Sequence, residues 1–344
     1  MSVIDAIWYG DGLAARAVRG ALLPASWLYG AGVAINGRKF ANDDGVHASA
    51  VPVLSLGNVS VGGTGKTPVA AWAAGRLASL GARPAIVMRG YGDDEPLVHA
   101  RLNPDVPVIV DADRVAGVER ARREGADCAI LDDGFQHRRI ARVSDWVLVS
   151  AERWRDDAHV LPAGPLREPI DAMSRAHVIL VTRKSASFAT AVEIASRLGA
   201  RFASARSAVC HLSMNDLVDA NSGERRALSW LGGRNVAAAA AVGDPDAFFA
   251  QLRAEGAHVE PHPFRDHHAF DTRDISTLAA AAAEHDGLVC TLKDAVKLAP
   301  RWPPAAAPLL YVSQIAVIED GQPSLDHALE AVLAARRAAT STAG

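Results

Sequence analysis

The 344-residue chain has few cysteines and little net charge, and both shortages exclude classes of protein. Its three cysteines, Cys128, Cys210 and Cys290, lie far apart without a CxxC pair, which excludes a disulfide framework and a zinc ribbon and fits a reducing compartment. We expect each of them to be a small buried hydrophobic residue. A net charge of −3 offers no excess of basic residues for bulk electrostatic attraction, so no nucleic-acid partner is predicted.

The chain also lacks a long unbroken apolar run. The uncharged stretch Gly20–Gly37 has 18 residues, which is at the lower limit of about 17–25 residues for a spanning helix. Pro24, Ser26, Asn36 and four glycines within it argue against a continuous span. We expect no signal peptide, because positive charges do not come first and no small-residue cleavage site follows.

Aromatic residues in the same region nevertheless point to a membrane surface. Trp8, Tyr9, Trp27 and Tyr29 are of the types that favour a membrane–water boundary. We therefore predict that residues 1–40 form a membrane-associating segment. The alternative is an N-terminal hairpin packed on the body of the protein, and the two interpretations are compatible.

The remaining chain has the composition and patterning of a globular α/β protein. Hydrophobic residues make up 49% and charged residues 22%, mean hydropathy is +0.07, and the length suggests about two domains. Short apolar runs alternate with longer amphipathic runs, which indicates a parallel sheet covered by helices on both faces. The expected strands are 51–57, 84–88, 106–111, 128–133, 146–150 and 177–182, and the expected helices are 66–80, 113–124 and 188–198.

A polar, turn-rich stretch at 206–227 separates this part from a second α/β set. Asn221-Ser222-Gly223 within it predicts a hairpin turn. Later strands are expected at 235–243, 258–264, 288–294 and 308–315, and helices at 246–255, 272–284 and 324–338, the last capped by Ser324. The predicted organisation is a membrane segment (1–40), a P-loop NTPase-type parallel-sheet domain (41–205), a linker hairpin (206–227) and a smaller α/β domain (228–344).

The strongest local motif is SVGGTGKT, residues 60–67, between a predicted strand and a predicted helix. It matches the phosphate loop G-x-x-x-x-G-K-[ST] except that Ser60 takes the first glycine position. Backbone N–H groups and the helix N-terminus would hold phosphates, with Lys66 at the β/γ-phosphates and Thr67 on Mg²⁺. The residues assigned to ATP binding are Ser60, Val61, Gly62, Gly63, Thr64, Gly65, Lys66 and Thr67.

A second motif, ILDDGFQH at 130–137, is an apolar run that ends in two acids. An aspartate in this place holds the metal in P-loop enzymes, and Asp132 and Asp133 are both candidates that sequence does not rank. Gln136 and His137 follow and are expected to line the same cleft. Both motifs should meet at the carboxyl edge of the sheet, where α/β proteins bind ligands.

These motifs support ATP chemistry but do not identify an acceptor, because phosphate loops serve kinases, GTPases and ATP-driven machines alike. A guanine-specific GTPase is expected to carry Asn/Thr-Lys-x-Asp late in the domain. The nearest stretch, Thr291-Leu292-Lys293-Asp294, has the wrong order.

Taken together, the motifs resemble the tetraacyldisaccharide 4′-kinase (lipid A 4′-kinase) family from about Pro24 to Lys297. Ser60 at the first P-loop position is usual in that family. The blocks that carry the resemblance are VPVLSLGNVSVGGTGKTP (51–68), RGYG (89–92), DEP (94–96), DRVAG (113–117), ILDDGFQHRRI (130–140), LPAGPLREP (161–169), DHHAF (266–270) and TLKDAVKL (291–298).

The resemblance implies a kinase with two α/β domains joined by a β linker. Members use MgATP to phosphorylate the 4′-hydroxyl of a tetraacylated glucosamine disaccharide 1-phosphate at the cytoplasmic face of the bacterial inner membrane. It therefore implies a lipid substrate, a membrane surface, peripheral attachment and no obligatory protein partner. A P-loop kinase for another sugar or lipid alcohol and an ATP-gated binding protein are the alternatives.

One feature departs from the family. RGYG runs straight into Asp93-Asp94-Glu95-Pro96, whereas members usually carry a longer segment and then Gly-Asp-Glu-Pro. The missing segment, between Gly92 and Asp93, is most simply a surface hairpin. Its loss bears on the placement of Asp94 and on part of the lipid-facing surface, and it removes no ligand of the phosphate loop.

The resemblance also implies a catalytic pair. Asp94 is the candidate base, and His267 assists it by swinging in when the two domains close over ATP. The alternatives are a helix cap for Asp94 and a surface-loop histidine for His267.

The other candidates are residues for substrate contact. Arg89 and Tyr91 follow a strand, although Tyr91 could equally form a structural turn, and Glu95 stands beside Asp94. Arg167 and Glu168 lie in the rigid LPAGPLREP loop, where an arginine can clamp phosphate through two N–H groups. The alternative for them is a solvated Arg167–Glu168 ion pair. The substrate-binding set is Arg89, Tyr91, Glu95, Gln136, His137, Arg167 and Glu168.

Overall fold

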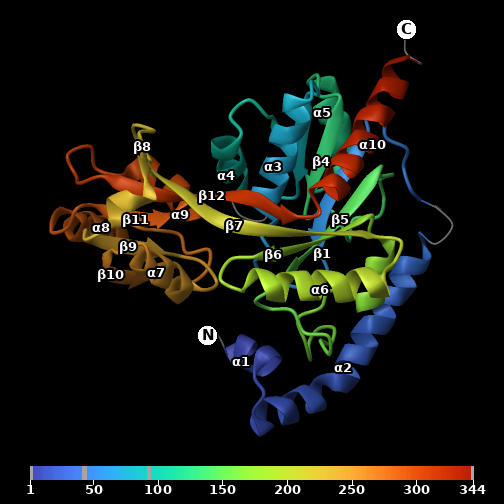
Figure 1. The fold of residues 1–344 in the computed structure, drawn as a ribbon, viewed down its shortest axis with the longest axis horizontal. Coiled ribbons are helices and arrows are strands. Elements are labelled where there is room, and N and C mark those ends of the chain that lie inside the picture. The colour runs from blue at the N-terminus through green and yellow to red at the C-terminus, as the bar shows by residue number, and fades with distance from the viewer. Residues whose placement is uncertain (1–2, 41–44, 91–93, 342–344) are drawn as a thin grey trace. The chain divides into compact units, whose positions relative to one another are not determined.

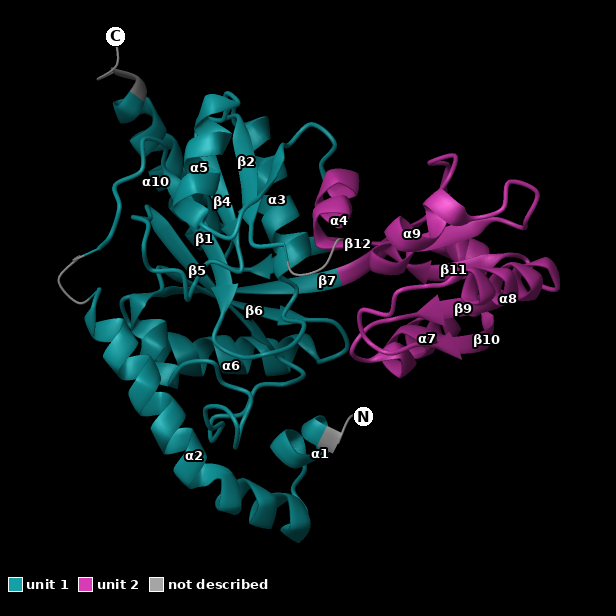
Figure 2. Ribbon diagram, turned by 180° about the vertical axis from the view of Figure 1, so that it is seen from behind, with its two compact units in different colours: residues 1–90, 103–212, 316–344 teal, residues 91–102, 213–315 magenta. Residues whose placement is uncertain are grey.

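The computed structural model of the chain describes residues 3–40, 45–90 and 94–341. It divides into two compact units, coloured separately in Figure 2. Unit 1 contains Met1–Gly90, Asn103–Leu212 and Ala316–Gly344, and unit 2 contains Tyr91–Leu102 and Ser213–Ile315. The strands β7 (Arg206–Asp219) and β12 (Leu309–Asp320) each begin in one unit and end in the other.

Unit 1 is built on a parallel sheet with the strand order β7-β6-β5-β1-β4-β2-β3 (Figure 1). The P-loop strand β1 lies between β4 and β5, and Leu56 of β1 pairs with Asp132 of β4. This confirms the predicted parallel sheet. Besides β7, the strands are β1 (Val53–Asn58), β2 (Pro84–Met88), β3 (Val108–Val110), β4 (Cys128–Asp132), β5 (Ser144–Ser150) and β6 (Val178–Arg183).

Helices cover both faces of this sheet because successive strand residues point to opposite sides. Leu56 and Leu148 pack in one core with α3 (Lys66–Ser79) and α10 (Gln322–Ser341). Val149 packs in the opposite core with α6 (Phe188–Arg201). The unit also contains α5 (Arg114–Arg123), packed on β2, β3 and β4, and the 3-10 helix η1 (Ile170–Arg175).

The strands of unit 2 follow the order β10-β9-β11-β12, and all three neighbouring pairs are parallel. One face packs against α4, α8 and α9 and the other against α7. A hairpin turn at 221–223 joins β7 to the antiparallel β8, as predicted. The elements are α4 (Asp94–Leu102), β8 (Arg225–Ala227), η2 (Leu228–Leu231), β9 (Asn235–Ala240), α7 (Pro245–Ala254), β10 (His258–Pro263), α8 (Thr272–Ala283), β11 (Leu288–Thr291), α9 (Leu292–Leu298) and η3 (Ala299–Arg301).

The N-terminal segment forms two helices in unit 1, α1 (Val3–Tyr9) and the long α2 (Leu13–Arg38) (Figure 1). Although Pro24 was expected to interrupt this region, α2 is continuous through it. Among the described residues, no helix combines the length and apolarity that a membrane crossing requires.

Further predictions differ from the observed fold. Residues 91–102 group with unit 2 because Val98 of α4 packs into its core, and 316–344 group with unit 1 because Leu329 of α10 packs there. The strand predicted at 288–294 ends at Thr291, whose hydroxyl accepts from the N–H of Asp294 and starts α9. Ser324 is not a cap: α10 begins at Gln322, and the Ser324 N–H already donates to the carbonyl of Gly321.

The cysteine prediction is confirmed, since Cys128, Cys210 and Cys290 are all buried and free. Burial raises the pKa of the Cys128 and Cys210 thiols to about 12. The structure therefore assigns them to packing.

Candidate functional site

The phosphate loop follows β1 directly, and two of its glycines adopt backbone conformations that disfavour other residues. Gly62 has φ of 104° and Gly65 has φ of 80°. A Cβ on Gly65 would also lie 2.2 Å from Cδ1 of Leu212. Gly65 precedes α3, so the first N–H groups of a 14-residue helix face the loop. This geometry suits an anion.

Asn58, the last residue of β1, holds the loop from within and was missed by sequence reasoning. Its side chain is buried, its Nδ2 donates to Oγ1 of Thr64 at 3.1 Å, and its Oδ1 accepts from Nζ of Lys66 at 3.4 Å. Thr182 of β6 adds a bond to the Thr64 carbonyl at 2.9 Å. A polar residue at the end of an otherwise apolar strand before a phosphate loop is the signal that could have identified Asn58.

Asp133 connects the second motif to the phosphate loop. It follows the last residue of β4 with a left-handed φ of 55°, which is uncommon outside glycine. Its carboxylate lies 3.5 Å from Nζ of Lys66, and Nη1 of Arg167 is 3.0 Å from both of its oxygens. Burial alone would raise the pKa of Asp133, but the charges of Lys66 and Arg167 outweigh it and lower the pKa.

Arg167 and Glu168 have different partners, so the predicted alternative of a solvated pair between them is wrong. Arg167 contacts Asp133 and also Oε1 of Gln136 at 3.4 Å. Glu168 is buried, accepts from Nε2 of Gln136 at 3.0 Å and pairs with Arg175 at 2.9 Å. Gln136 therefore joins both side chains, which places three of the predicted residues in one network.

The loop that carries Arg167 is fastened to the phosphate loop through its backbone. The Val61 N–H donates to the Pro165 carbonyl at 2.8 Å, and the Arg167 N–H donates to the Val59 carbonyl at 2.7 Å. These bonds join the two loops through their backbones. The position of the Arg167 side chain is thereby linked to the position of the phosphate-binding backbone.

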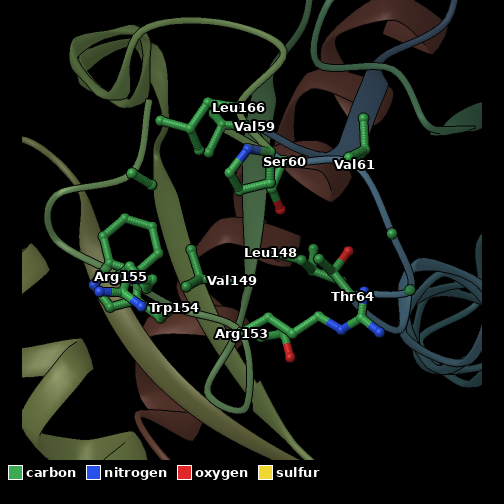
Figure 3. A pocket seen from close by; sticks show the side chains of 15 residues that line it. Val59, Ser60, Val61, Thr64, Leu148, Val149, Arg153, Trp154, Arg155 and Leu166 are labelled. Atoms are coloured by element: carbon green, nitrogen blue, oxygen red, sulfur yellow. The ribbon is translucent and has the colours of Figure 1, made fainter. Parts of the chain in front are cut away.

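A small hollow opens beside the phosphate loop (Figure 3). Loop residues 59–64 line one side, and Arg153, which follows β5, extends toward Thr64. The Arg153 guanidinium also lies 3.5 Å from Asp5 and 5.7 Å from the ring centre of Tyr9. Sequence reasoning missed Arg153, and the only available signal was a basic residue just beyond the strand beside β1.

The oxygen donors near the loop suit magnesium better than a transition metal. Thr67 offers a hydroxyl, and Asp132 and Asp133 offer carboxylates. Within the described ranges, no group of three or more His, Cys, Asp or Glu side chains forms a dedicated metal cage. Mg²⁺ in phosphoryl-transfer sites takes one or two protein oxygens, with phosphate and water completing its shell. The residues present fit that requirement.

Unit 2 contains a separate cluster of charged side chains around Asp94. The side chain of Asp94 is only 3% exposed, and its Oδ2 lies 3.2 Å from Nζ of Lys297, 3.9 Å from Nζ of Lys293 and 3.7 Å from Nδ1 of His267. Lys293 Nζ is 3.0 Å from Nε2 of His267. An ammonium can only donate, so Nε2 accepts, and the ring proton is placed on Nδ1, facing Asp94.

This cluster changes the prediction about domain closure. Asp94 and His267 both belong to unit 2, so the proximity of the two side chains needs no movement of one unit on the other. His267 has a left-handed φ of 59° and a half-exposed side chain. His267 is thus a loop residue after β10 that lies beside a buried carboxylate. The two lysines, to which sequence analysis gave no role, complete the cluster.

The remaining predicted residues lie outside the two groups of contacts around Asp133 and Asp94. Arg89 follows β2 and is exposed, Glu95 lies in the first turn of α4, and Tyr91 lies outside the described residues. His137 does not join the Lys66–Asp133–Arg167 network in the part of the chain that the structure describes. Burial, with Arg114 and Arg142 nearby, lowers the pKa of His137 to about 4.

This lowered pKa predicts acid sensitivity. Between about pH 6.5 and pH 4, His137 is protonated in the unfolded chain but neutral in the folded chain. The free energy of unfolding therefore falls as the pH falls through that window. His137→Gln should reduce the loss, measured as the shift of the urea midpoint between about pH 7 and about pH 5. The exposed His327→Gln is the matched control. Equal shifts in wild type and His137→Gln would contradict the assignment.

Comparison with known proteins gives consistent matches. A family model described as tetraacyldisaccharide-1-P 4′-kinase matches residues 18–334. The chain is 36% identical over 316 residues to a tetraacyldisaccharide 4′-kinase of Halorhodospira halophila, covering 86% of this chain and 87% of the relative. It is 36% identical over 375 residues to a protein of the same name from Anaeromyxobacter sp. (strain Fw109-5), covering 100% of both.

A solved structure supports the fold. The crystal structure described as the "apo" form of LpxK from Aquifex aeolicus in complex with ATP matches with a TM-score of 0.71 and 24% identity. It covers 92% of this chain and 99% of the solved one. The match extends across the elements of both units.

Proposed function

Because the chain belongs to the tetraacyldisaccharide-1-P 4′-kinase family, we propose that it transfers the γ-phosphoryl group of ATP to the 4′-hydroxyl of tetraacyldisaccharide 1-phosphate. The product is the 1,4′-bisphosphorylated precursor of lipid A. The observation that carries this proposal is that a chain of this family holds both a phosphate loop and an imidazole beside a buried carboxylate.

Unit 1 supplies the residues for the nucleotide. Residues 60–67 would hold the phosphates through backbone N–H groups, and Lys66 would stabilise negative charge on the β- and γ-phosphates. Bound Mg²⁺ would offset phosphate charge. Asp132, at the end of the strand beside β1, and Asp133, which follows it, are the candidates to hold it with Thr67.

Unit 2 supplies the base. Nε2 of His267 accepts a hydrogen bond from Lys293, and the acceptor hydroxyl would take the place of that donor. The hydroxyl proton passes to Nε2, the sugar oxygen forms a bond to the γ-phosphorus, and the bond to the leaving ADP oxygen breaks. Asp94 orients the ring and stabilises its positive charge, and Lys297 holds the carboxylate in place.

His267→Ala should lower kcat by about 10³-fold, because the hydroxyl loses its proton acceptor while ATP binding in unit 1 is untouched. The measurement is the steady-state transfer rate at saturating ATP, with His258→Ala on the exposed start of β10 as control. Wild-type turnover of His267→Ala would remove the residue from the mechanism.

The N-terminal helices are proposed to bring the enzyme to its substrate. Leu13, Trp27, Leu28 and Ile35 of α2 are at least 62% exposed, which is unusual for large apolar side chains. Such a surface suits peripheral contact with the cytoplasmic face of the inner membrane, from which the acyl chains of the acceptor need not leave. No nucleic acid and no obligatory protein partner are required by this account.

Another acceptor alcohol and an ATP-gated binding protein are the alternatives. The decisive assay uses purified protein in detergent micelles, labelled MgATP and tetraacyldisaccharide 1-phosphate, with product separated by charge. A bis-phosphorylated lipid that forms only with the acceptor supports the proposal. ATP hydrolysis stimulated by a protein partner, without labelled lipid, would favour the ATP-gated protein, and labelling of another alcohol alone would favour the other kinase.

A further inference from the structure

The inner face of α2 makes specific polar contacts with the loop that carries Arg167, defined here as residues 159–168. Ser26 is 2% exposed, and its Oγ donates to the Val160 carbonyl and accepts from the Ala163 N–H, both at 2.9 Å. One turn on, the Tyr29 hydroxyl donates to the carbonyl of Arg167 at 3.0 Å.

The same loop is bonded to the phosphate loop on its other side. The Val61 N–H donates to Pro165, the Arg167 N–H donates to Val59, and Ser60 forms an isolated antiparallel bridge with Leu166. The Arg167 side chain then contacts Asp133, which contacts Lys66. A continuous series of bonds within unit 1 therefore runs from α2 to the lysine of the phosphate loop.

These contacts are more specific than attachment of a membrane helix requires. A helix that only anchors the protein needs an apolar outer face and any packed inner face. Here the buried inner residue is a serine whose donor and acceptor are both used by loop backbone, and those backbone groups lose these partners if the hydroxyl is removed. A further contact fastens the far end of α2, where Arg138 donates to the Gly37 carbonyl at 2.9 Å.

We propose that Ser26 and Tyr29 of α2 are positioning residues for the nucleotide site: they hold residues 159–168, and through them Arg167 and the phosphate loop, in the geometry that binds ATP. The inference rests on the proposed function only in taking ATP as the ligand of unit 1. It makes the N-terminal helix a working part of the kinase site in addition to its proposed role at the membrane.

The effect should appear in nucleotide affinity. Ser26→Ala takes the acceptor away from the Ala163 N–H and leaves the Val160 carbonyl with the Gly164 N–H as its donor, and we expect the Kd for ATP to rise about 10-fold. Tyr29→Phe removes one hydroxyl from the Arg167 carbonyl and should raise it about 3-fold. Ser26→Thr keeps a hydroxyl at the same position and should restore much of the affinity.

The experiment is titration calorimetry of MgATP into the full chain in detergent, without acceptor, for these three variants and wild type. Ser174→Ala is the matched control, because its exposed hydroxyl bonds only to the neighbouring Asp171 carbonyl. Circular dichroism and the melting temperature establish folding, and the KM for the lipid should stay unchanged while the KM for ATP rises.

Wild-type ATP affinity in both folded Ser26→Ala and folded Tyr29→Phe would overturn the proposal. If Ser26→Ala does not fold, Tyr29→Phe alone decides. ATP binding is measured without the acceptor, so the two proposals can fail separately. A wild-type chain that binds ATP but phosphorylates no lipid contradicts the proposed function. A wild-type chain that phosphorylates the lipid, with variants that bind ATP as tightly as wild type, contradicts only this inference.

Discussion

Asp94→Asn should lower kcat for phosphoryl transfer by about 10³-fold while leaving the KM for ATP nearly unchanged. The substitution keeps the size of a side chain that is 3% exposed but removes the charge that faces His267 Nδ1 at 3.7 Å. An imidazole without that carboxylate is poorly oriented, and the positive charge that it gains on taking the hydroxyl proton is not stabilised. Steady-state kinetics with ATP and acceptor varied separately measure the split.

Two controls keep this prediction specific. Asp246→Asn changes an exposed aspartate in the first turn of α7, also in unit 2, and should leave kcat at the wild-type value. The double variant Asp94→Asn/His267→Ala should be little worse than the worse single variant, because the two side chains act as a unit. Full activity of Asp94→Asn, or additive losses in the double variant, would contradict the paired role.

Lys66→Ala should lower the rate of phosphoryl transfer by at least about 10²–10³-fold, to the background of the assay. Lys66 is the first residue of α3, and its ammonium lies 3.4 Å from Oδ1 of Asn58 and 3.5 Å from Oδ1 of Asp133. These contacts fix the position of the ammonium before the nucleotide binds. Its removal takes the positive charge away from the transferred group and leaves Asp133 with Arg167 as its cation. The readout is labelled lipid formed per enzyme from labelled MgATP.

Lys184→Ala, on the exposed loop after β6, is the matched control for loss of one positive charge in unit 1. It should retain the wild-type rate. Substantial lipid phosphorylation by Lys66→Ala would show that residues 60–67 are not the phosphate loop of this reaction.

Much of unit 1 was predictable from sequence because its signals are local. The apolar runs of β1, β4 and β6 predict buried parallel strands. Residues 60–67, between a strand and a helix, predict a phosphate loop. The predicted meeting of the two motifs agrees with the contact between Lys66 and Asp133. The contact of Arg167 with Asp133 and Gln136 was not predicted.

The parts that sequence did not predict depend on long-range packing. Asp94 follows shortly after β2 in the chain, yet α4 belongs to unit 2 because Val98 packs among residues near 275–311. No local sequence pattern predicts a packing contact between residues so far apart in the chain. The same applies to α10, which belongs to unit 1 although it follows unit 2 in the chain. It applies also to Ser26, which the sequence analysis used only as an argument against a membrane-spanning helix, whereas its hydroxyl bonds to Val160 and Ala163.

Whether phosphate from ATP reaches the 4′-hydroxyl is decided by comparing two acceptor lipids. The purified chain is incubated with γ-labelled MgATP and either tetraacyldisaccharide 1-phosphate or its 4′-deoxy analogue in the same micelles. We expect one labelled phosphate per lipid with the natural acceptor and none with the analogue. Equal labelling of both lipids, or of neither while ATP binds, would contradict it.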